Sequence, residues 1–61
     1  MNIMEYRELV KQRIMDIKEC SEAEAERIAN KWVAEIVDAY ELDNSEESAD
    51  DEAKEIVAYD F

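Results

Sequence analysis

The complete absence of glycine and proline is the feature that most restricts how this chain folds. Average usage is roughly 7% glycine and 5% proline, so a chain of this length would ordinarily contain about seven such residues. Tight turns and sheet corners depend on them, and phosphate-cradling loops need glycine. Alanine, glutamate, lysine, isoleucine and valine recur instead at helical spacings. We therefore predict an all-α fold and exclude P-loop and dinucleotide-binding motifs.

The first predicted helix covers residues 3–19. Helical spacing places six large side chains on one apolar arc: Ile3, Tyr6, Leu9, Val10, Ile14 and Ile17. Beside that arc, Arg7, Lys11 and Lys18 form a narrow basic stripe. The stripe either contacts an acidic partner or neutralises the acidic third segment of the same chain, and we favour the second.

The second predicted helix covers residues 22–42 and starts at Ser21, which forms a capping-box pattern with Glu24. Its apolar arc consists of Ala25, Ile28, Ala29, Trp32, Val33, Ile36, Ala39 and Tyr40. The two arcs differ in phase, which indicates a break at Cys20-Ser21. One continuous helix over 3–42 is the alternative, because coiled-coil drift of about 20° per heptad explains much of the offset.

A short acidic helix over 46–59 follows the interruption at residues 43–45, with Ser45 or Ser48 as its cap. Lys54 is expected to pair with Asp50 at i,i+4 spacing. Because the apolar side of this helix is thin, it folds either alone or only on binding.

A single domain over 1–61 is the limit for 61 residues, and its core is small. Cys20 is the only cysteine, so no disulfide forms within the chain. The expected architecture is a two- or three-helix antiparallel hairpin or bundle, with homodimerisation as a route to a larger core.

The formal net charge of −11 excludes direct binding to nucleic acid or to anionic membranes, since both need basic surfaces. Residues 1–20 are neutral overall, residues 21–42 carry −4, and residues 43–61 carry −7. The early charges do not fit a signal peptide. We expect a cytoplasmic protein, in the host cytoplasm if it is viral, whose partner has a basic surface and binds nucleic acid.

Catalysis and metal binding find little support in the sequence. The chain contains no histidine, and its carboxyl groups fall on polar helix faces rather than in sheltered pockets. Cys20 fits a small apolar filler at the end of the first helix. An EF-hand starting at Asp43 fails, because glycine is absent and Lys54 occupies the bidentate acid position. We expect no enzyme activity, no cofactor and no metal.

Ten carboxylates form the candidate partner-binding face: Glu35, Asp38, Glu41, Asp43, Glu46, Glu47, Asp50, Asp51, Glu52 and Glu55. A helical array of carboxylates has a spacing comparable to that of DNA phosphates, so it can occupy a basic channel. In size, charge and helicity the chain resembles small acidic bacteriophage proteins that disable host-defence or nuclease complexes. The hypothesis is a protein-binding inhibitor that mimics DNA. The alternative is a structural adaptor or helical homodimer that uses its apolar faces, with acidity serving only solubility.

Three aromatic residues, Trp32, Tyr40 and Phe61, are candidate anchors for a partner's pocket, although core packing is the simpler role for the first two. The terminal Asp60-Phe61 with its upstream acids loosely resembles the C-terminal tip of bacterial single-stranded-DNA-binding proteins. That resemblance implies docking on replication or repair enzymes. Packing of Phe61 back on the core is the simpler expectation.

Overall fold

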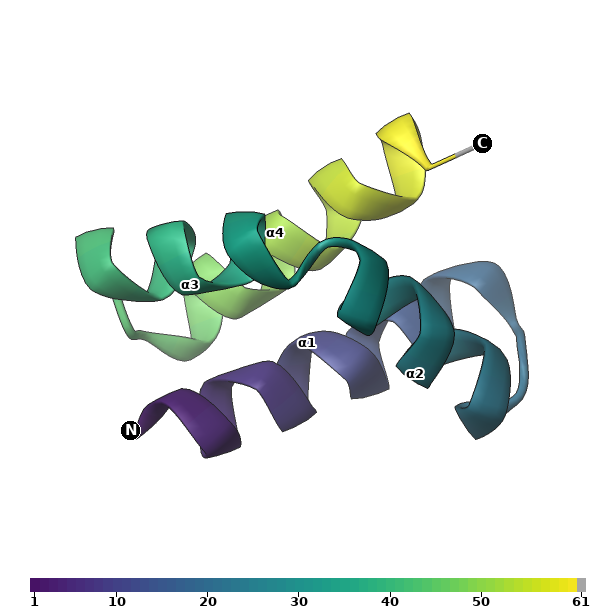
Figure 1. The fold of residues 1–61 in the computed structure, drawn as a ribbon, viewed down its shortest axis with the longest axis horizontal. Coiled ribbons are helices and arrows are strands. Elements are labelled where there is room, and N and C mark those ends of the chain that lie inside the picture. Colours follow the sequence, from purple (N-terminus) through teal and green to yellow (C-terminus); the bar gives the residue numbers. More distant parts are fainter. Residues whose placement is uncertain (61) are drawn as a thin grey trace.

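Four α-helices make up the fold in the computed structural model, which describes residues 1–60. Helix α1 covers Ile3–Lys18, α2 covers Glu22–Lys31, α3 covers Val33–Leu42 and α4 covers Glu46–Tyr59. In Figure 1, α1 runs from left to right, α2 passes in front of its right-hand half, α3 continues to the left above α1, and α4 runs back toward the right. The all-α class is confirmed for the described residues, whereas the expected number of helices, two or three, is wrong. The range of α4 is the one expected for the short acidic helix.

The break at Cys20-Ser21 is confirmed, and the continuous helix over 3–42 does not form. Glu19 ends α1 in the left-handed region with φ 53° and ψ 44°. Ser21 is extended, and its Oγ accepts a hydrogen bond from the Glu24 backbone N–H at 3.2 Å. The Glu24 side chain does not complete the expected capping box, because it pairs with Arg27 instead.

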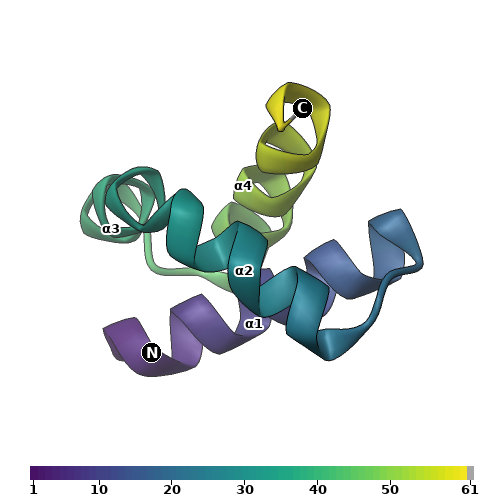
Figure 2. The same cartoon turned by 45° about the vertical axis from the view of Figure 1, so that its right-hand side comes forward.

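A second break, at Trp32, divides the helix expected over 22–42 into α2 and α3. Trp32 has φ −104° and ψ 21°, and no side chain caps the start of α3. The chain changes direction between α2 and α3, as Figure 2 shows. The break allows Ile28 on α2 and Ile36 on α3 both to be fully buried. Packing of the apolar face thus overrides the local preference for a straight helix.

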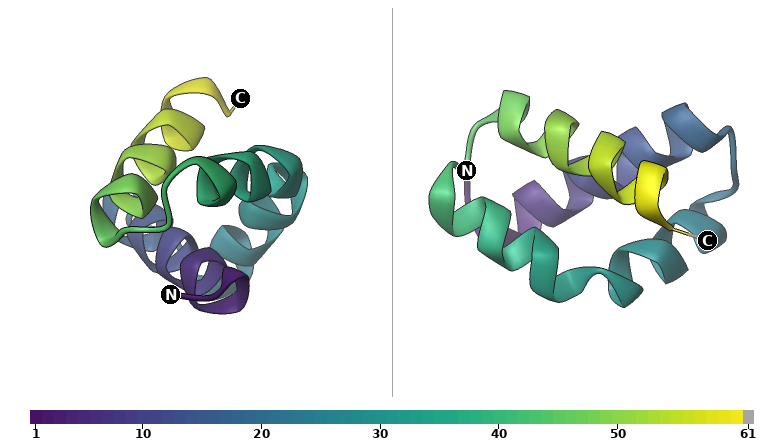
Figure 3. Two further views of the ribbon diagram at one scale, coloured as in Figure 1. Left: turned by 90° about the vertical axis from the view of Figure 1, so that its left-hand side faces the viewer. Right: turned by 90° about the horizontal axis from the view of Figure 1, so that it is seen from above.

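Every helix contributes to one hydrophobic core. Viewed along the long axis, α1, α4 and the α2–α3 pair form three sides around the interior (Figure 3). Ten residues form the buried cluster: Tyr6, Val10, Ile14, Ala25, Ile28, Ala29, Ile36, Ala49, Ala53 and Ile56. The expected arc of the first helix is wrong at one end, because Ile17 in its last turn is 43% exposed.

Candidate functional site

Negative charge is concentrated on one half of the folded molecule. Residues 1–32, which contain α1 and α2, carry seven acids and six bases, for a net charge of −1. Residues 33–60, which contain α3 and α4, carry eleven acids and one base, Lys54, for a net charge of −10. The candidate site is therefore the surface of α3 and α4.

Most bases of the first half are bound by carboxylates within the chain. Lys11 lies 3.1 to 3.6 Å from three glutamates on α1 and α2. Arg27 pairs with Glu24 at 2.6 Å, and Lys31 pairs with Asp60 at 2.9 Å. The expectation that the basic stripe neutralises the third segment fails for Lys11, which faces α2, and for Arg7, which donates to the Asn30 side chain. The positive charge of Lys18 does act on Asp60 of the third segment, where it helps to lower the pKa of that carboxyl.

Arg13, which the sequence analysis did not single out, is the base of α1 that contacts α4. Its guanidinium forms an ion pair and hydrogen bond with Asp50. The expected pair between Lys54 and Asp50 does not form within residues 1–60, since Asp50 points to Arg13 instead. Because of this ion pair, Asp50 is not one of the unpaired carboxylates of the candidate site.

Nine members of the predicted acidic face have no ion-pair partner within residues 1–60. Among the ten candidates, only Asp50 is paired, and only Asp50 and Glu52 are half-buried rather than exposed. Eight of these nine carboxylates lie on α3 and α4, which pack against each other, and Asp43 lies in the connection between the two helices. We call these nine the acidic face: Glu35, Asp38, Glu41, Asp43, Glu46, Glu47, Asp51, Glu52 and Glu55.

Glu52 lies where the carboxylates of the two helices converge. Partial burial raises the pKa of Glu52 above its ordinary value of 4.5, and the negative charges of Glu55, Glu35 and Asp38 raise it further. Since Glu35 and Asp38 belong to α3 and Glu55 to α4, both helices direct negative charge to one place. This convergence makes the acidic face continuous across the two helices.

A groove of about 290 Å³ lies at the end of these helices and is bordered by five carboxylates. Its lining residues are Ala39, Leu42, Asp43, Glu47, Ser48, Asp51, Glu52 and Glu55. None of them is basic, so the groove attracts cationic groups.

Tyr6 reaches this region from the core, where its side chain is fully buried. Its hydroxyl is 2.8 Å from Ser48 Oγ, and its ring packs edge-on against Tyr40 at a centroid distance of 5.5 Å. Burial raises the pKa of Tyr6, the hydrogen bond with Ser48 lowers it, and the charge of Glu52 raises it again. The phenol therefore stays neutral near pH 7 and supports the groove as a packed hydrogen-bonding group.

The predicted aromatic anchors serve packing where the structure describes them. Tyr40 is half-buried against Tyr6. Trp32 is half-buried, and its Nε1 donates to Asp60 Oδ1 at 2.9 Å. Phe61 lies outside the described residues. The Asp60 side chain is only 5% exposed and accepts a second contact from Lys31, so it is not presented as part of a free tip.

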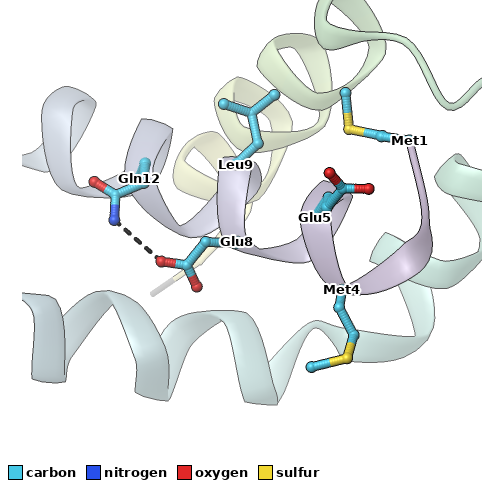
Figure 4. A pocket seen from close by; sticks show the side chains of 6 residues that line it. All are labelled: Met1, Met4, Glu5, Glu8, Leu9 and Gln12. Atoms are coloured by element: carbon cyan, nitrogen blue, oxygen red, sulfur yellow. Dashed lines mark hydrogen bonds between the residues drawn. The ribbon is translucent and has the colours of Figure 1, made fainter.

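The large apolar side chains that are most exposed are Leu42, at 88%, and Met4, at 79%. Leu42 borders the acidic groove. Met4 borders an open hollow of about 580 Å³ on α1, which Figure 4 shows together with Met1 and Leu9. Neither residue was predicted as a contact from the sequence, although the position of Met4 outside the apolar arc was a signal for exposure.

No protein-family model matches this chain, and neither a curated protein nor a solved structure does. Across residues 1–60, no group of three or more acidic or cysteine side chains is placed to hold a metal ion. In the same part of the chain, no helix is long and apolar enough to cross a membrane.

Proposed function

We propose that this chain is a non-enzymatic inhibitor that binds the basic surface of a nucleic-acid-processing or host-defence enzyme by mimicking DNA. The observation that supports the proposal is the acidic face, with nine carboxylates that have no ion-pair partner in the described residues, on α3, on α4 and at Asp43 between them. Residues one turn apart, such as Glu47, Asp51 and Glu55, repeat at roughly 6 Å along α4. Such rows of charge match lysines and arginines that otherwise bind phosphates.

The separation of charge within the molecule favours binding over solubility as the reason for this acidity. A net charge of magnitude about 2–8, spread over the surface, is sufficient to keep a small domain soluble. Here one half of the chain carries −10 while the other is nearly neutral. Concentrated like charge destabilises the compact state by repulsion, so its retention on one surface is consistent with selection for a basic partner.

The test is displacement of DNA, measured by fluorescence anisotropy. The protein is titrated into complexes between a labelled duplex of about 20 base pairs and each of a panel of basic nucleases and repressors. We expect displacement from at least one enzyme, with affinity falling steeply between about 50 and about 200 mM salt.

A matched pair of triple variants separates the acidic face from net charge. Glu35→Gln with Asp38→Asn and Glu55→Gln neutralises the face around Glu52. Asp16→Asn with Glu19→Gln and Glu22→Gln removes the same charge from exposed positions outside it, and also removes the contacts of Asp16 with Arg13 and of Glu22 with Lys11. We expect about tenfold or greater loss of affinity only in the first variant, with helicity unchanged in circular dichroism. Equal losses in both variants, or no displacement anywhere in the panel, would contradict the proposal.

The adaptor remains the second candidate, because Leu42 and Met4 are highly exposed apolar side chains. It predicts partner binding or self-association that is insensitive to salt and is lost in Leu42→Ser or Met4→Ser. These positions suit the test because both side chains are largely outside the core, whereas Ile36 is fully buried. Sedimentation of the wild-type protein as a folded monomer at micromolar concentration would exclude the homodimer.

A further inference from the structure

The bend between α2 and α3 has no local cause in the sequence. Neither glycine nor proline occurs in the chain, and no side chain caps the start of α3. The first-turn N–H groups of Val33, Ala34 and Glu35 have no acceptor within α3. A straight helix would pair them with the carbonyl groups of residues 29–31. Contacts from elsewhere in the fold therefore favour the bent form over a straight helix.

Asp60 supplies such a contact from the end of α4. Its Oδ1 is 2.9 Å from Lys31 Nζ and 2.9 Å from Trp32 Nε1, so one carboxylate oxygen binds both residues at the bend. The Asp60 side chain is 5% exposed. Figure 3 shows the C-terminal end of α4 coming down beside the α2–α3 segment.

Helix α3 is otherwise weakly anchored. Ile36 is its only fully buried residue, while Ala39 and Tyr40 are half-buried. The negative charges of Glu35 and Asp38 act on Glu52 of α4, and this repulsion tends to separate the two helices. Burial of Ile36 and the Asp60 contact therefore oppose both the repulsion and the unmade backbone hydrogen bonds.

We propose that Trp32 is a hinge and that Asp60 is the latch that holds it bent. When Asp60 is released, α2 and α3 join into one helix over 22–42, and the carboxylates of α3 move away from those of α4. The hinge is inferred from the bend at Trp32 and the contacts of Asp60 alone. Its functional consequence, that the acidic face is assembled only in the latched form, rests on the function proposed above.

Amide hydrogen exchange measured by NMR tests the latch without any partner. In Asp60→Ala, we expect the amides of Val33, Ala34 and Glu35 to exchange about tenfold more slowly than in the wild type, because each gains a helical acceptor. The amides of Ile14 and Ile28 in the core serve as the reference. The exchange of these core amides should stay the same or become faster. Asp51→Ala is the matched control, since it removes an exposed acid of α4 that forms no ion pair in the described residues.

Unchanged or faster exchange at residues 33–35 in Asp60→Ala would overturn the latch. If that variant does not fold, Trp32→Phe keeps an aromatic ring at this position and removes the N–H donor to Asp60 while Lys31 remains. The same three amides should then slow by a smaller factor, and the absence of slowing would again overturn the latch. DNA displacement reports separately on the proposed function, because loss of displacement in the face variant with a normal exchange pattern leaves the latch intact.

Discussion

Lys11 shows how a charged side chain on the edge of an apolar arc becomes part of the packing. The residue is 7% exposed, and its Nζ lies 3.1, 3.6 and 3.4 Å from carboxylate oxygens of Glu8, Glu22 and Glu26. The hydrogen bond with Glu8 is the main cause of a raised pKa at Lys11, and the same contact lowers the pKa of Glu8. One cation thus links α1 to α2 and offsets repulsion among three carboxylates.

We expect Lys11→Gln to be less stable than Lys18→Gln at pH 7, although both remove one positive charge. The raised pKa means that the contribution of Lys11 is present below its ordinary value of 10.5 and is lost as the pH rises through the folded value. In acid, the difference between the variants should shrink as Glu8 becomes protonated below its ordinary value of 4.5. Urea unfolding at pH 7 and in acid measures the stability of both variants. Equal stability of the two variants at pH 7 would contradict the prediction.

Helix α4 illustrates how a local cap sets a distant contact. Ser45 Oγ accepts a hydrogen bond from the Ser48 backbone N–H at 3.2 Å, and Ser48 Oγ lies 2.8 Å from the Tyr6 hydroxyl. The first turn of the helix contains Glu46 and Glu47, whose negative charges are favourable at a helix N-terminus. These two acids therefore stabilise their own helix besides contributing to the acidic face.

Ser45→Ala is expected to lower the free energy of unfolding by about 1 kcal/mol, because the start of α4 loses its cap. In a chain of this size the midpoint of thermal unfolding should fall by about 4–8 °C. Ser45→Asn restores a capping oxygen and should recover most of the loss. If the alanine variant melts at the wild-type temperature, the cap does not stabilise α4.

At the scale of the whole molecule, separation of charge makes stability depend on pH in two opposite ways. Glu52 has a raised pKa, so the folded state takes up its proton before the unfolded state does as the pH falls. The pKa values of Glu24 and Asp60 are lowered by contacts with Arg27 and Lys31, so their stabilisation is lost in stronger acid. As the pH falls, protonation of Glu52 therefore relieves repulsion before Glu24 and Asp60 lose their ion pairs.

We expect the free energy of unfolding to rise as the pH falls from neutral toward 4.5, the ordinary pKa of Glu52, and to decline in stronger acid. Glu52→Gln should weaken the rise, because it removes the group whose folded pKa is raised, and should leave the acid decline in place. Urea unfolding across this pH range provides the measurement. A stability that falls steadily from pH 7, with no difference between the variant and the wild type, would contradict the convergence at Glu52.

The sequence was sufficient to predict which acidic residues belong to the candidate site, but not which of them are unpaired in the folded protein. The ten carboxylates could be found because acids crowd the second half of the sequence. The exclusion of Asp50 could not, since its pairing with Arg13 joins residues 37 positions apart. The exposure of Leu42 was equally hidden, because it depends on which face of α3 meets the core.

The sequence by itself determined the all-α class, the break at Cys20-Ser21 and the range of the last helix. These features depend on residues that are close together in the sequence: the absence of glycine and proline, the helical spacing of apolar residues and the capping serines. The linear sequence is therefore sufficient to predict them. Only the tertiary structure decided the bend at Trp32 and the burial of Lys11. Both depend on contacts between helices: at the bend, burial of Ile28 and Ile36 acts together with the Asp60 contact against the local preference for a straight helix.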